Sequence, residues 1–247
     1  MIKLSEVEEL KAASRGAIVD RELVRLVDRK GIDGCRLYLE DLRWPGGAEC
    51  PRCESGRLLW IGKRAKYHCR DCRYQFRVTA GTLFHDTHLP LPKWFLAISL
   101  MLSSDRGLPA TRLHEILGGS YKTAWFLEHR IRAAMGGQVG ELGPLVAFVA
   151  AETAVPSGSD ELRRTAGGGV EVPASWFLLK RIVAGQYHRL SPKYLTAYWD
   201  EIRWRDAHHR NPHAFRDTVI ALLGHPPVSY EQLVAPPAPA AVMVSAA

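Results

Sequence analysis

Four cysteines arranged as two Cys-x-x-Cys pairs are the residues of this chain best suited to chemistry. Cys50 and Cys53 form the first pair and Cys69 and Cys72 the second, with 15 residues between the pairs. A two-residue gap lets both thiolates of a pair reach one ion at about 2.3 Å, so the spacing predicts a tetrahedral zinc site. Four thiolates leave no open coordination position, so we expect structural rather than catalytic zinc. Four unrelated cysteines, or two disulfides in a secreted protein, are the alternatives.

The residues between and after the cysteine pairs have the pattern of a small antiparallel ribbon. Short strands are expected at 57–61 and 67–69, joined by a hairpin tip at 62–66, and a third strand is expected at 74–78. Such a ribbon has too few apolar residues to fold without help, so the metal is expected to hold it closed.

Positive charge is concentrated in and around this ribbon. Residues 41–80 contain nine Lys or Arg against four acids, whereas residues 136–175 contain two Arg against five acids. The formal net charge of the whole chain, +7, indicates a polyanionic partner. A basic loop on a ribbon is well placed to touch a nucleic-acid backbone, although a solvated turn is the alternative. The ribbon side chains expected to contact phosphates are Lys63, Arg64, Lys66 and Arg73.

Helical patterns flank the ribbon on both sides. Before it, helices are expected at 5–14, 20–30 and 33–42 as a lead-in that packs on its neighbours. After it, a buried helix is expected to begin at Pro92, because proline is favoured in the first helical turn.

Residues 109–132 have the pattern of a helix-turn-helix. A short helix at 109–117 is followed by two glycines and then by a longer helix capped by a serine. The first turn of the second helix would face a DNA major groove, although two helices of a plain bundle are the alternative. The side chains expected to contact DNA here are Ser120, Tyr121, Lys122, Thr123 and, farther along the same helix, Arg130.

Composition places the chain among ordinary globular proteins of the cytoplasm. It has 247 residues, of which 47% are hydrophobic and 24% charged. The longest apolar stretch, near 95–102, is too short to cross a bilayer, so no membrane association is expected. Acidic residues interrupt any apolar run in the first ten positions, so no signal peptide is expected. Four paired cysteines with Cys35 left over fit a reducing compartment.

The chain resembles the zinc-ribbon insertion-sequence transposases of bacteria over about residues 31–136 and 175–234. In that family, a zinc ribbon and a helix-turn-helix precede a nuclease domain of RNase-H-like fold. The motifs that carry the resemblance are the ribbon spacing, Gly-Thr-Leu-Phe-His at 81–85, Pro-Lys-Trp-Phe at 92–95, Ser-Tyr-Lys-Thr-Ala-Trp at 120–125, Leu-Leu-Lys-Arg at 178–181, Gly-Gln-Tyr-His at 185–188, Ser-Pro-Lys-Tyr-Leu at 191–195 and Tyr-Trp-Asp-Glu at 198–201.

Between the two matching stretches, the sequence departs from the family. The resemblance implies several acids that together hold two divalent metals for phosphodiester chemistry. Ala151 stands where the family has its first aspartate, next to Glu152, and residues 172–175 read Val-Pro-Ala-Ser where another acid or amide is expected. The acids available in this stretch are Glu152, Asp160, Glu161 and Glu171. No strands are predicted to hold them in register, so solvated loop carboxylates are expected rather than a nuclease centre, and no catalytic residue is assigned.

The expected fold is mainly α with a small β zinc ribbon. It ends in a degenerate remnant of an RNase-H-like domain. The expected units are a helical lead-in (1–44), the zinc ribbon (45–82), the helix-turn-helix (83–136), a linker and degenerate nuclease remnant (137–175), a C-terminal helical remnant (176–234) and a tail without a core (235–247).

The favoured hypothesis is a zinc-dependent protein that binds double-stranded DNA and derives from an insertion-sequence transposase. The resemblance implies that its ancestral target was the terminal inverted repeats of an element, and we expect no strand transfer. It would work in the bacterial cytoplasm at the nucleoid, with a homo-oligomer as one option. One alternative is an active transposase, the only reading that calls for Mg²⁺. Another is a ribbon that contacts proteins.

Overall fold

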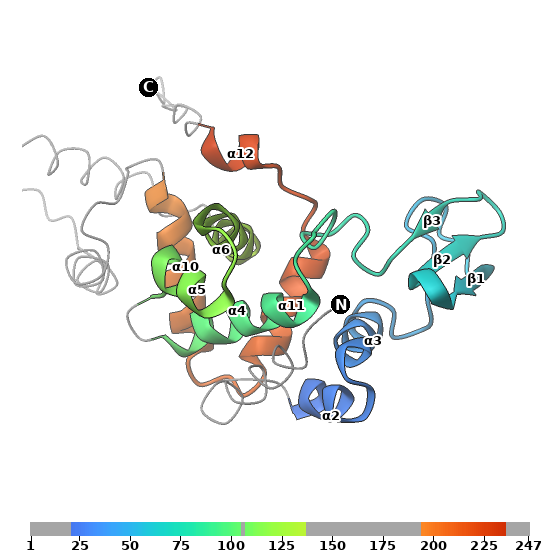
Figure 1. Ribbon diagram of the computed structural model, residues 1–247, viewed down its shortest axis with the longest axis horizontal. Coiled ribbons are helices and arrows are strands. Elements are labelled where there is room, and N and C mark those ends of the chain that lie inside the picture. Colours follow the sequence, from blue (N-terminus) through green and yellow to red (C-terminus); the bar gives the residue numbers. More distant parts are fainter. Residues whose placement is uncertain (1–20, 105–106, 137–193, 236–247) are drawn as a thin grey trace, which may run out of the picture.

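The computed structural model describes residues 21–104, 107–136 and 194–235. Within these ranges the chain is mainly helical and has one small antiparallel sheet, as the sequence predicts. The sheet lies at one end of the molecule, and most helices pack together at the other (Figure 1). The helix expected at 5–14, the stretch 137–193 and the tail from 236 onward lie outside the described residues.

Two short helices, α2 (Arg21–Lys30) and α3 (Ile32–Arg43), form a helical hairpin that leads into the ribbon. Gly31 makes the turn with a positive φ of 57°, a conformation that glycine adopts without strain. The two helices approach so closely that a Cβ on Gly34 would lie 2.4 Å from the carbonyl oxygen of Leu26. Only glycine therefore permits this packing.

The ribbon is a three-stranded sheet in the order β1-β2-β3. Its strands are β1 (Leu58–Ile61), β2 (Lys66–Cys69) and β3 (Gln75–Phe76). A single 3₁₀ turn, η1 (Gly62–Arg64), joins β1 to β2. In the register, Trp60 lies opposite Tyr67, and Tyr67 lies opposite Phe76. The third strand is shorter than the sequence predicts.

Three helices follow the ribbon: α4 (Leu91–Ser103), α5 (Ala110–Leu117) and α6 (Tyr121–Met135). Gly118 and Gly119 both have positive φ, at 66° and 87°, which turns the chain sharply between α5 and α6. Ser120 then caps α6, because its hydroxyl accepts a hydrogen bond from the backbone N–H of Thr123 at 3.1 Å. The local sequence thus sets the geometry of this helix pair.

Three C-terminal helices are described: α10 (Leu195–His208), α11 (Ala214–Gly224) and α12 (Tyr230–Val234). The first two lie within the C-terminal helical remnant expected at 176–234. A separate helix at α12 was not expected, although a capping box between Ser229 and Gln232 marks its start. None of the helices in the described ranges is long and apolar enough to cross a membrane.

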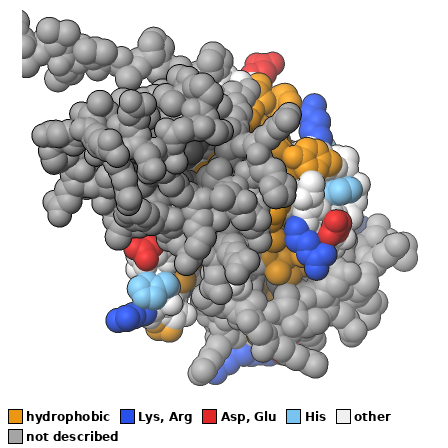
Figure 2. Space-filling view, turned by 90° about the vertical axis from the view of Figure 1, so that its left-hand side faces the viewer, with side chains coloured by type: hydrophobic (Ala, Val, Ile, Leu, Met, Phe, Trp, Pro, Cys, Tyr) orange, Lys and Arg blue, Asp and Glu red, His pale blue; other side chains and the backbone are white. Residues whose placement is uncertain are grey.

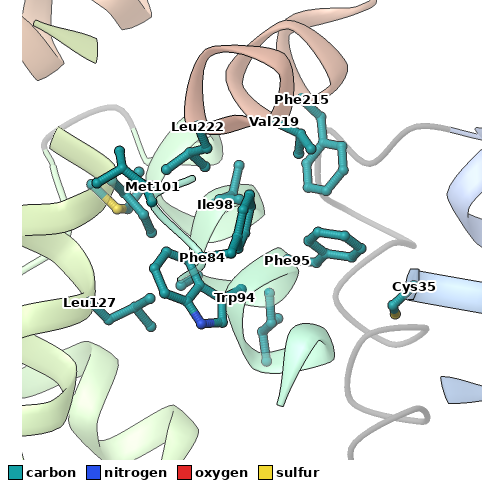
Figure 3. Close-up of a cluster of buried hydrophobic side chains, with 14 of the residues drawn as sticks. Cys35, Phe84, Trp94, Phe95, Ile98, Met101, Leu127, Phe215, Val219 and Leu222 are labelled. Atoms are coloured by element: carbon teal, nitrogen blue, oxygen red, sulfur yellow. The ribbon is translucent and has the colours of Figure 1, made fainter. Parts of the chain in front are cut away.

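The main hydrophobic core joins helices that are distant in sequence (Figure 3). Phe95 of α4 meets Tyr38 of α3 edge-on at 5.8 Å between ring centroids and Phe215 of α11 at the same distance. Near these rings, the backbone N–H of Leu83 donates to the carbonyl of Leu222 at 3.2 Å. The lead-in hairpin and the C-terminal helices therefore share one core with α4 and α6.

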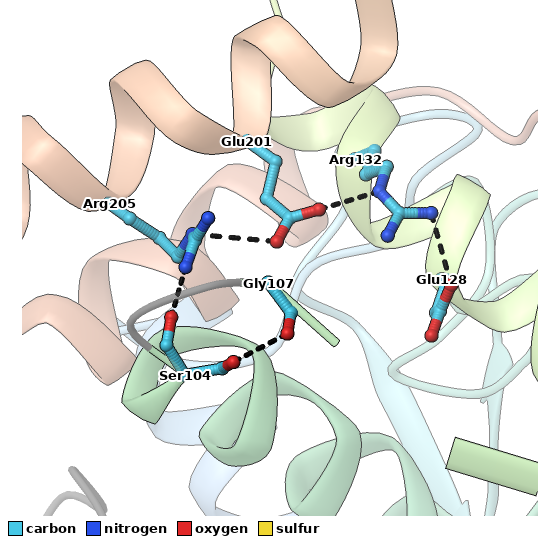
Figure 4. A network of polar contacts seen from close by, with 6 residues as sticks. All are labelled: Ser104, Gly107, Glu128, Arg132, Glu201 and Arg205. Carbon is cyan, nitrogen blue, oxygen red and sulfur yellow. Dashed lines mark hydrogen bonds and ion pairs between the residues drawn. The ribbon is translucent and has the colours of Figure 1, made fainter. Parts of the chain in front are cut away.

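A buried network of charges ties α6 to α10 (Figure 4). Arg132 donates to Glu201 at 2.7 Å and to Glu128 at 3.1 Å, and all three side chains are fully or almost fully buried. Arg205 lies 3.4 Å from the other oxygen of Glu201 and donates to the carbonyl of Ser104 just after α4. Three elements are thus joined by paired charges inside the helical region.

Candidate metal centre and nucleic-acid interface

The four cysteine sulfurs of the ribbon converge on one point, as the spacing predicts. All four Sγ atoms lie within 4.8 Å of one another, and all are free thiols. The Sγ atoms of Cys50 and Cys72 are 3.6 Å apart, and those of Cys53 and Cys69 are 3.5 Å apart. A regular tetrahedron with zinc–sulfur bonds of about 2.3 Å has edges of about 3.8 Å, so the sulfurs fit a zinc ion.

The two cysteine pairs are built in the same way. In each pair, the backbone N–H of the first cysteine donates to the carbonyl five residues further along, at 3.1 Å for Cys50 and 2.9 Å for Cys69. The residue after the second cysteine is left-handed in both cases, with φ of 59° at Glu54 and 59° at Arg73. These turns bring both sulfurs of a pair to the same side of the chain, as one ion requires.

Polar contacts also join one pair to the other. The Arg57 guanidinium donates from Nε to Asp71 at 3.0 Å, and the Ser55 hydroxyl donates to the same carboxylate. Arg57 and Ser55 follow the first pair, whereas Asp71 lies within the second. The carboxylate therefore holds the two turns together from outside the metal site.

Backbone hydrogen bonds act on the pKa of two of the thiols, with different net results. The backbone N–H of Cys72 lowers the pKa of the Cys69 thiol, because a hydrogen bond to sulfur favours the thiolate. The backbone N–H of Ser55 acts in the same direction on Cys53, but hydrogen bonds among the sulfurs and burial raise the pKa of that thiol to about 12. A bound cation would replace the shared protons, so loading of the site is expected to release protons.

Aromatic rings attach the ribbon to the end of α3. Trp44, the residue after α3, meets Tyr67 at 5.7 Å and Phe76 at 6.1 Å between ring centroids. The guanidinium of Arg36 on α3 lies 4.7 Å from the ring centroid of Trp60. Helix α3 is thus part of the ribbon's packing unit.

The four ribbon cations expected to contact phosphates lie on accessible surface. Lys63 and Arg64 are exposed in the 3₁₀ turn, and Arg73 is exposed after the second cysteine pair. Lys66 begins β2 and is half-buried. All four remain in reach of a partner at the ribbon surface.

The first turn of α6 carries the other expected contact residues. Tyr121 is 50% exposed, and Ser120 and Thr123 share a hydrogen bond between their hydroxyls at 2.8 Å. The ammonium group of Lys122 lies 4.4 Å from the ring centroid of Tyr230 on α12. Helix α12, which the sequence analysis missed, therefore borders this surface.

Arg130 lines the same cavity as Ser120, Lys122 and Thr123 but differs from them in its burial. Its side chain is only 5% exposed. The guanidinium donates to the carbonyl of His85 at 3.0 Å and lies 5.2 Å from the ring centroids of both Trp94 and Phe126. Arg130 braces the segment that leaves the ribbon, because packing of α6 on α4 turns this position inward.

Comparison with known proteins agrees with this geometry. Residues 33–75 match a transposase zinc-ribbon domain. The match begins in α3, the helix that packs on the ribbon, and includes all four cysteines. An uncharacterized protein in transposable element ISH50 of Halobacterium salinarum is 29% identical over 100 residues, which are 39% of this chain. The matched stretch spans 33% of that relative's length. No solved structure matches the chain.

The acids available for a nuclease centre lie outside the described residues. They are Glu152, Asp160, Glu161 and Glu171. Within residues 21–104, 107–136 and 194–235, the cysteine site is the only cluster suited to hold a metal.

Proposed function

We propose that this protein binds double-stranded DNA through a zinc-stabilised ribbon and the first turn of α6, and that it derives from an insertion-sequence transposase. The observation that carries the proposal is the convergence of four cysteine sulfurs within a segment that matches a transposase zinc-ribbon domain. The ancestral target would be the inverted repeats at the ends of an element.

We assign different DNA contacts to the ribbon and to the first turn of α6, because their side chains differ in chemistry. Zinc, when bound, fixes the cysteine turns and thereby the hairpin that carries Lys63, Arg64 and Lys66. These cations would contact phosphates, which position a protein on DNA without reading sequence. The exposed Tyr121, with Lys122, would enter a groove and read base edges.

Fluorescence anisotropy with labelled duplex DNA over a range of salt concentrations tests the proposal. The logarithm of the affinity should fall with the logarithm of salt by about 0.9 for each neutralised phosphate. Replacing Lys63 and Arg64 together by Ala should weaken binding and reduce that slope by about 2. Arg29→Ala, at the exposed end of α2, is the matched control and should change neither quantity. Absence of binding to any duplex at low salt contradicts the proposal.

We further propose that the protein lacks strand-transfer activity. Ala151 occupies the position of the family's first aspartate, and a methyl side chain cannot hold a divalent metal. A strand-transfer assay with Mg²⁺ or Mn²⁺ tests this point directly. Product that disappears in Glu152→Ala would establish the alternative of an active transposase.

A ribbon that contacts proteins instead of DNA makes a different prediction. Charge reversal at Lys63, Arg64 and Lys122 would then leave any DNA affinity unchanged. Under the DNA-binding proposal, the same triple reversal should abolish measurable binding, because like charges would face the phosphates.

A further inference from the structure

Two cavities lie side by side between the ribbon and the first turn of α6. One, of about 560 Å³, opens beside the ribbon and is lined there by Lys66, Gln75 and Arg77. The other, of about 400 Å³, opens beside α6 and is lined there by Ser120 and Lys122. Both cavities lie within the size range of ligand pockets.

A single segment of chain lies between the two cavities and lines both of them. Asp86, Thr87 and His88 line both of them, so the cavities form one trough that crosses this connector. The connector leaves β3 and runs to the start of α4, between the ribbon and α6 (Figure 1). We refer to the two cavities with residues 85–88 as the connector trough.

The connector is held in place from beneath. The indole N–H of Trp94 donates to the Thr87 hydroxyl at 2.9 Å, and the backbone N–H of Leu89 donates to the same oxygen at 3.1 Å. Arg130 donates to the carbonyl of His85 at 3.0 Å. Side chains from α4 and α6 therefore fix the floor of the trough before any partner binds, which reduces the entropic cost of binding.

Positive charge lies at both ends of the trough. Lys66 and Arg77 supply it at the ribbon end, where the lining is mainly polar. Lys122 and the largely buried Arg130 supply it at the α6 end, where the lining is mainly apolar and includes Phe126 and Tyr230. The His88 imidazole lies between the two ends. The acid that lines both cavities, Asp86, has a side chain that is 92% exposed and lies 3.4 Å from the His85 ring. Arginine, lysine, hydroxyl and imidazole groups are typical contacts of phosphate oxygens.

The described side chains visible at the left-hand side of Figure 1 carry charges of both signs. Figure 2 shows that side, where acids and histidines lie among the Lys and Arg, beside a hydrophobic band. In the trough, cations lie at both ends.

We propose that one strand of duplex DNA follows the connector trough, so that the ribbon and α6 contact the same strand, with Arg77 at the ribbon end and His88 between the two elements. This inference rests on the proposed DNA binding and adds the path of the strand. It assigns DNA contacts to Arg77 and His88, neither of which the sequence analysis singled out. Arg77 follows β3 and is exposed, and His88 is exposed on the connector.

Two substitutions at exposed positions test this path in the full-length, zinc-loaded protein. His88→Glu should weaken binding to a labelled duplex by at least about tenfold, because it places a like charge against the phosphates. Arg77→Ala should reduce the salt slope by about 0.9, as expected for the loss of one phosphate contact. Arg29→Ala on α2, which changes the charge by the same amount as either variant, is the matched control and should leave affinity within about twofold. Zinc content and circular dichroism verify that each variant is folded.

A photo-crosslinking amino acid at position 88 gives an independent readout. It should crosslink to duplex DNA, whereas the same group at position 29 should not. If Lys63→Ala and Lys122→Ala weaken binding while His88→Glu and Arg77→Ala do not, the ribbon and α6 bind DNA by another path and the trough proposal is wrong. If the wild-type protein binds no duplex at all, the proposed function itself fails. A crosslink to a single strand but not to a duplex would also overturn the proposal.

Discussion

The ribbon buries four hydrophobic residues in its own cluster, Cys50, Cys69, Phe76 and Ala80, and two of these are candidate metal ligands. The helical region instead buries a continuous core contributed by α2, α3, α4, α5, α6 and α11. A core as small as that of the ribbon rarely supports a fold by itself. The comparison shows that the cluster of four cysteines lies where buried apolar area is scarce, whereas the helical region has a core of its own.

Charged residues also behave differently in the two regions. In the ribbon, Arg57 pairs with Asp71 at the surface, and the Arg57 side chain is 76% exposed. In the helical region, Arg132 is fully buried between Glu128 and Glu201. Exposed ion pairs contribute little to stability, whereas breaking a buried pair leaves a charge without compensation. The two regions should therefore respond very differently to the loss of one charged partner.

Removal of the metal should produce the largest difference between the regions. Structural zinc in small domains contributes an apparent free energy of about 10–16 kcal/mol, so chelation should unfold the ribbon. The helical region should keep its circular dichroism at 222 nm, because its core contains no candidate ligand. Tryptophan fluorescence should report the loss of the environment around Trp44 and Trp60. Unfolding of all helices upon chelation would contradict this separation.

Glu201→Ala should produce the next largest effect, and only in the helical region. It leaves the buried Arg132 without one of its two carboxylates, which typically destabilises a protein by about 3–5 kcal/mol. Urea denaturation followed at 222 nm measures the loss, while zinc content should stay unchanged. Glu231→Ala on α12, an exposed acid, is the matched control and should change stability by less than about 0.5 kcal/mol.

Two neighbouring buried groups in α6 should contribute to the stability of the helical region with opposite dependence on pH. Burial raises the pKa of Glu128 to about 7, and burial lowers the pKa of His129 to about 3. The stability that Glu128 contributes through this shift is fully present below about pH 4.5 and is lost as the pH rises toward 7. The stability that His129 contributes is fully present above about pH 6.5 and is lost as the pH falls toward 3.

These two contributions should cancel between about pH 4.5 and 6.5, because the folded and unfolded states then bind the same number of protons at this pair. In Glu128→Gln, the free energy of unfolding should fall on acidification by about 1.4 kcal/mol per pH unit. In His129→Phe it should rise by a similar amount. Urea titrations of both variants at several pH values provide the measurement, and parallel profiles for the two variants would refute this account.

Glu54→Gly should give the smallest effect, and it is confined to the ribbon. The left-handed backbone at Glu54 costs a non-glycine residue about 1–2 kcal/mol, and glycine removes that strain while it loses more entropy on folding. The net gain in stability of the zinc-loaded ribbon should be at most about 1 kcal/mol. Glu49→Gly, at an exposed residue without positive φ, should instead be neutral or destabilising. A gain at both positions would contradict the explanation from strain.

The sequence by itself determined the features that depend on neighbouring residues. The spacing of Cys50, Cys53, Cys69 and Cys72 predicted the metal site, and the structure brings their sulfurs together. Ser120 was predicted to cap α6 and does so. Periodicity located α2 and α3 closely. Turns, caps and ligand spacing are short-range constraints, so they can be read within a few positions along the chain.

Only the tertiary structure decided which charges are exposed and which surfaces meet. Arg130 occupies a helix that has the pattern of a DNA-binding element, yet packing of α6 against α4 buries it under the connector. Arg132 and Glu201 are 69 positions apart, and their pairing depends on how α10 packs on α6. The trough likewise exists because the ribbon and α6 flank one connector. Burial and pairing at such separations are set by the packing of whole elements, which no local pattern encodes.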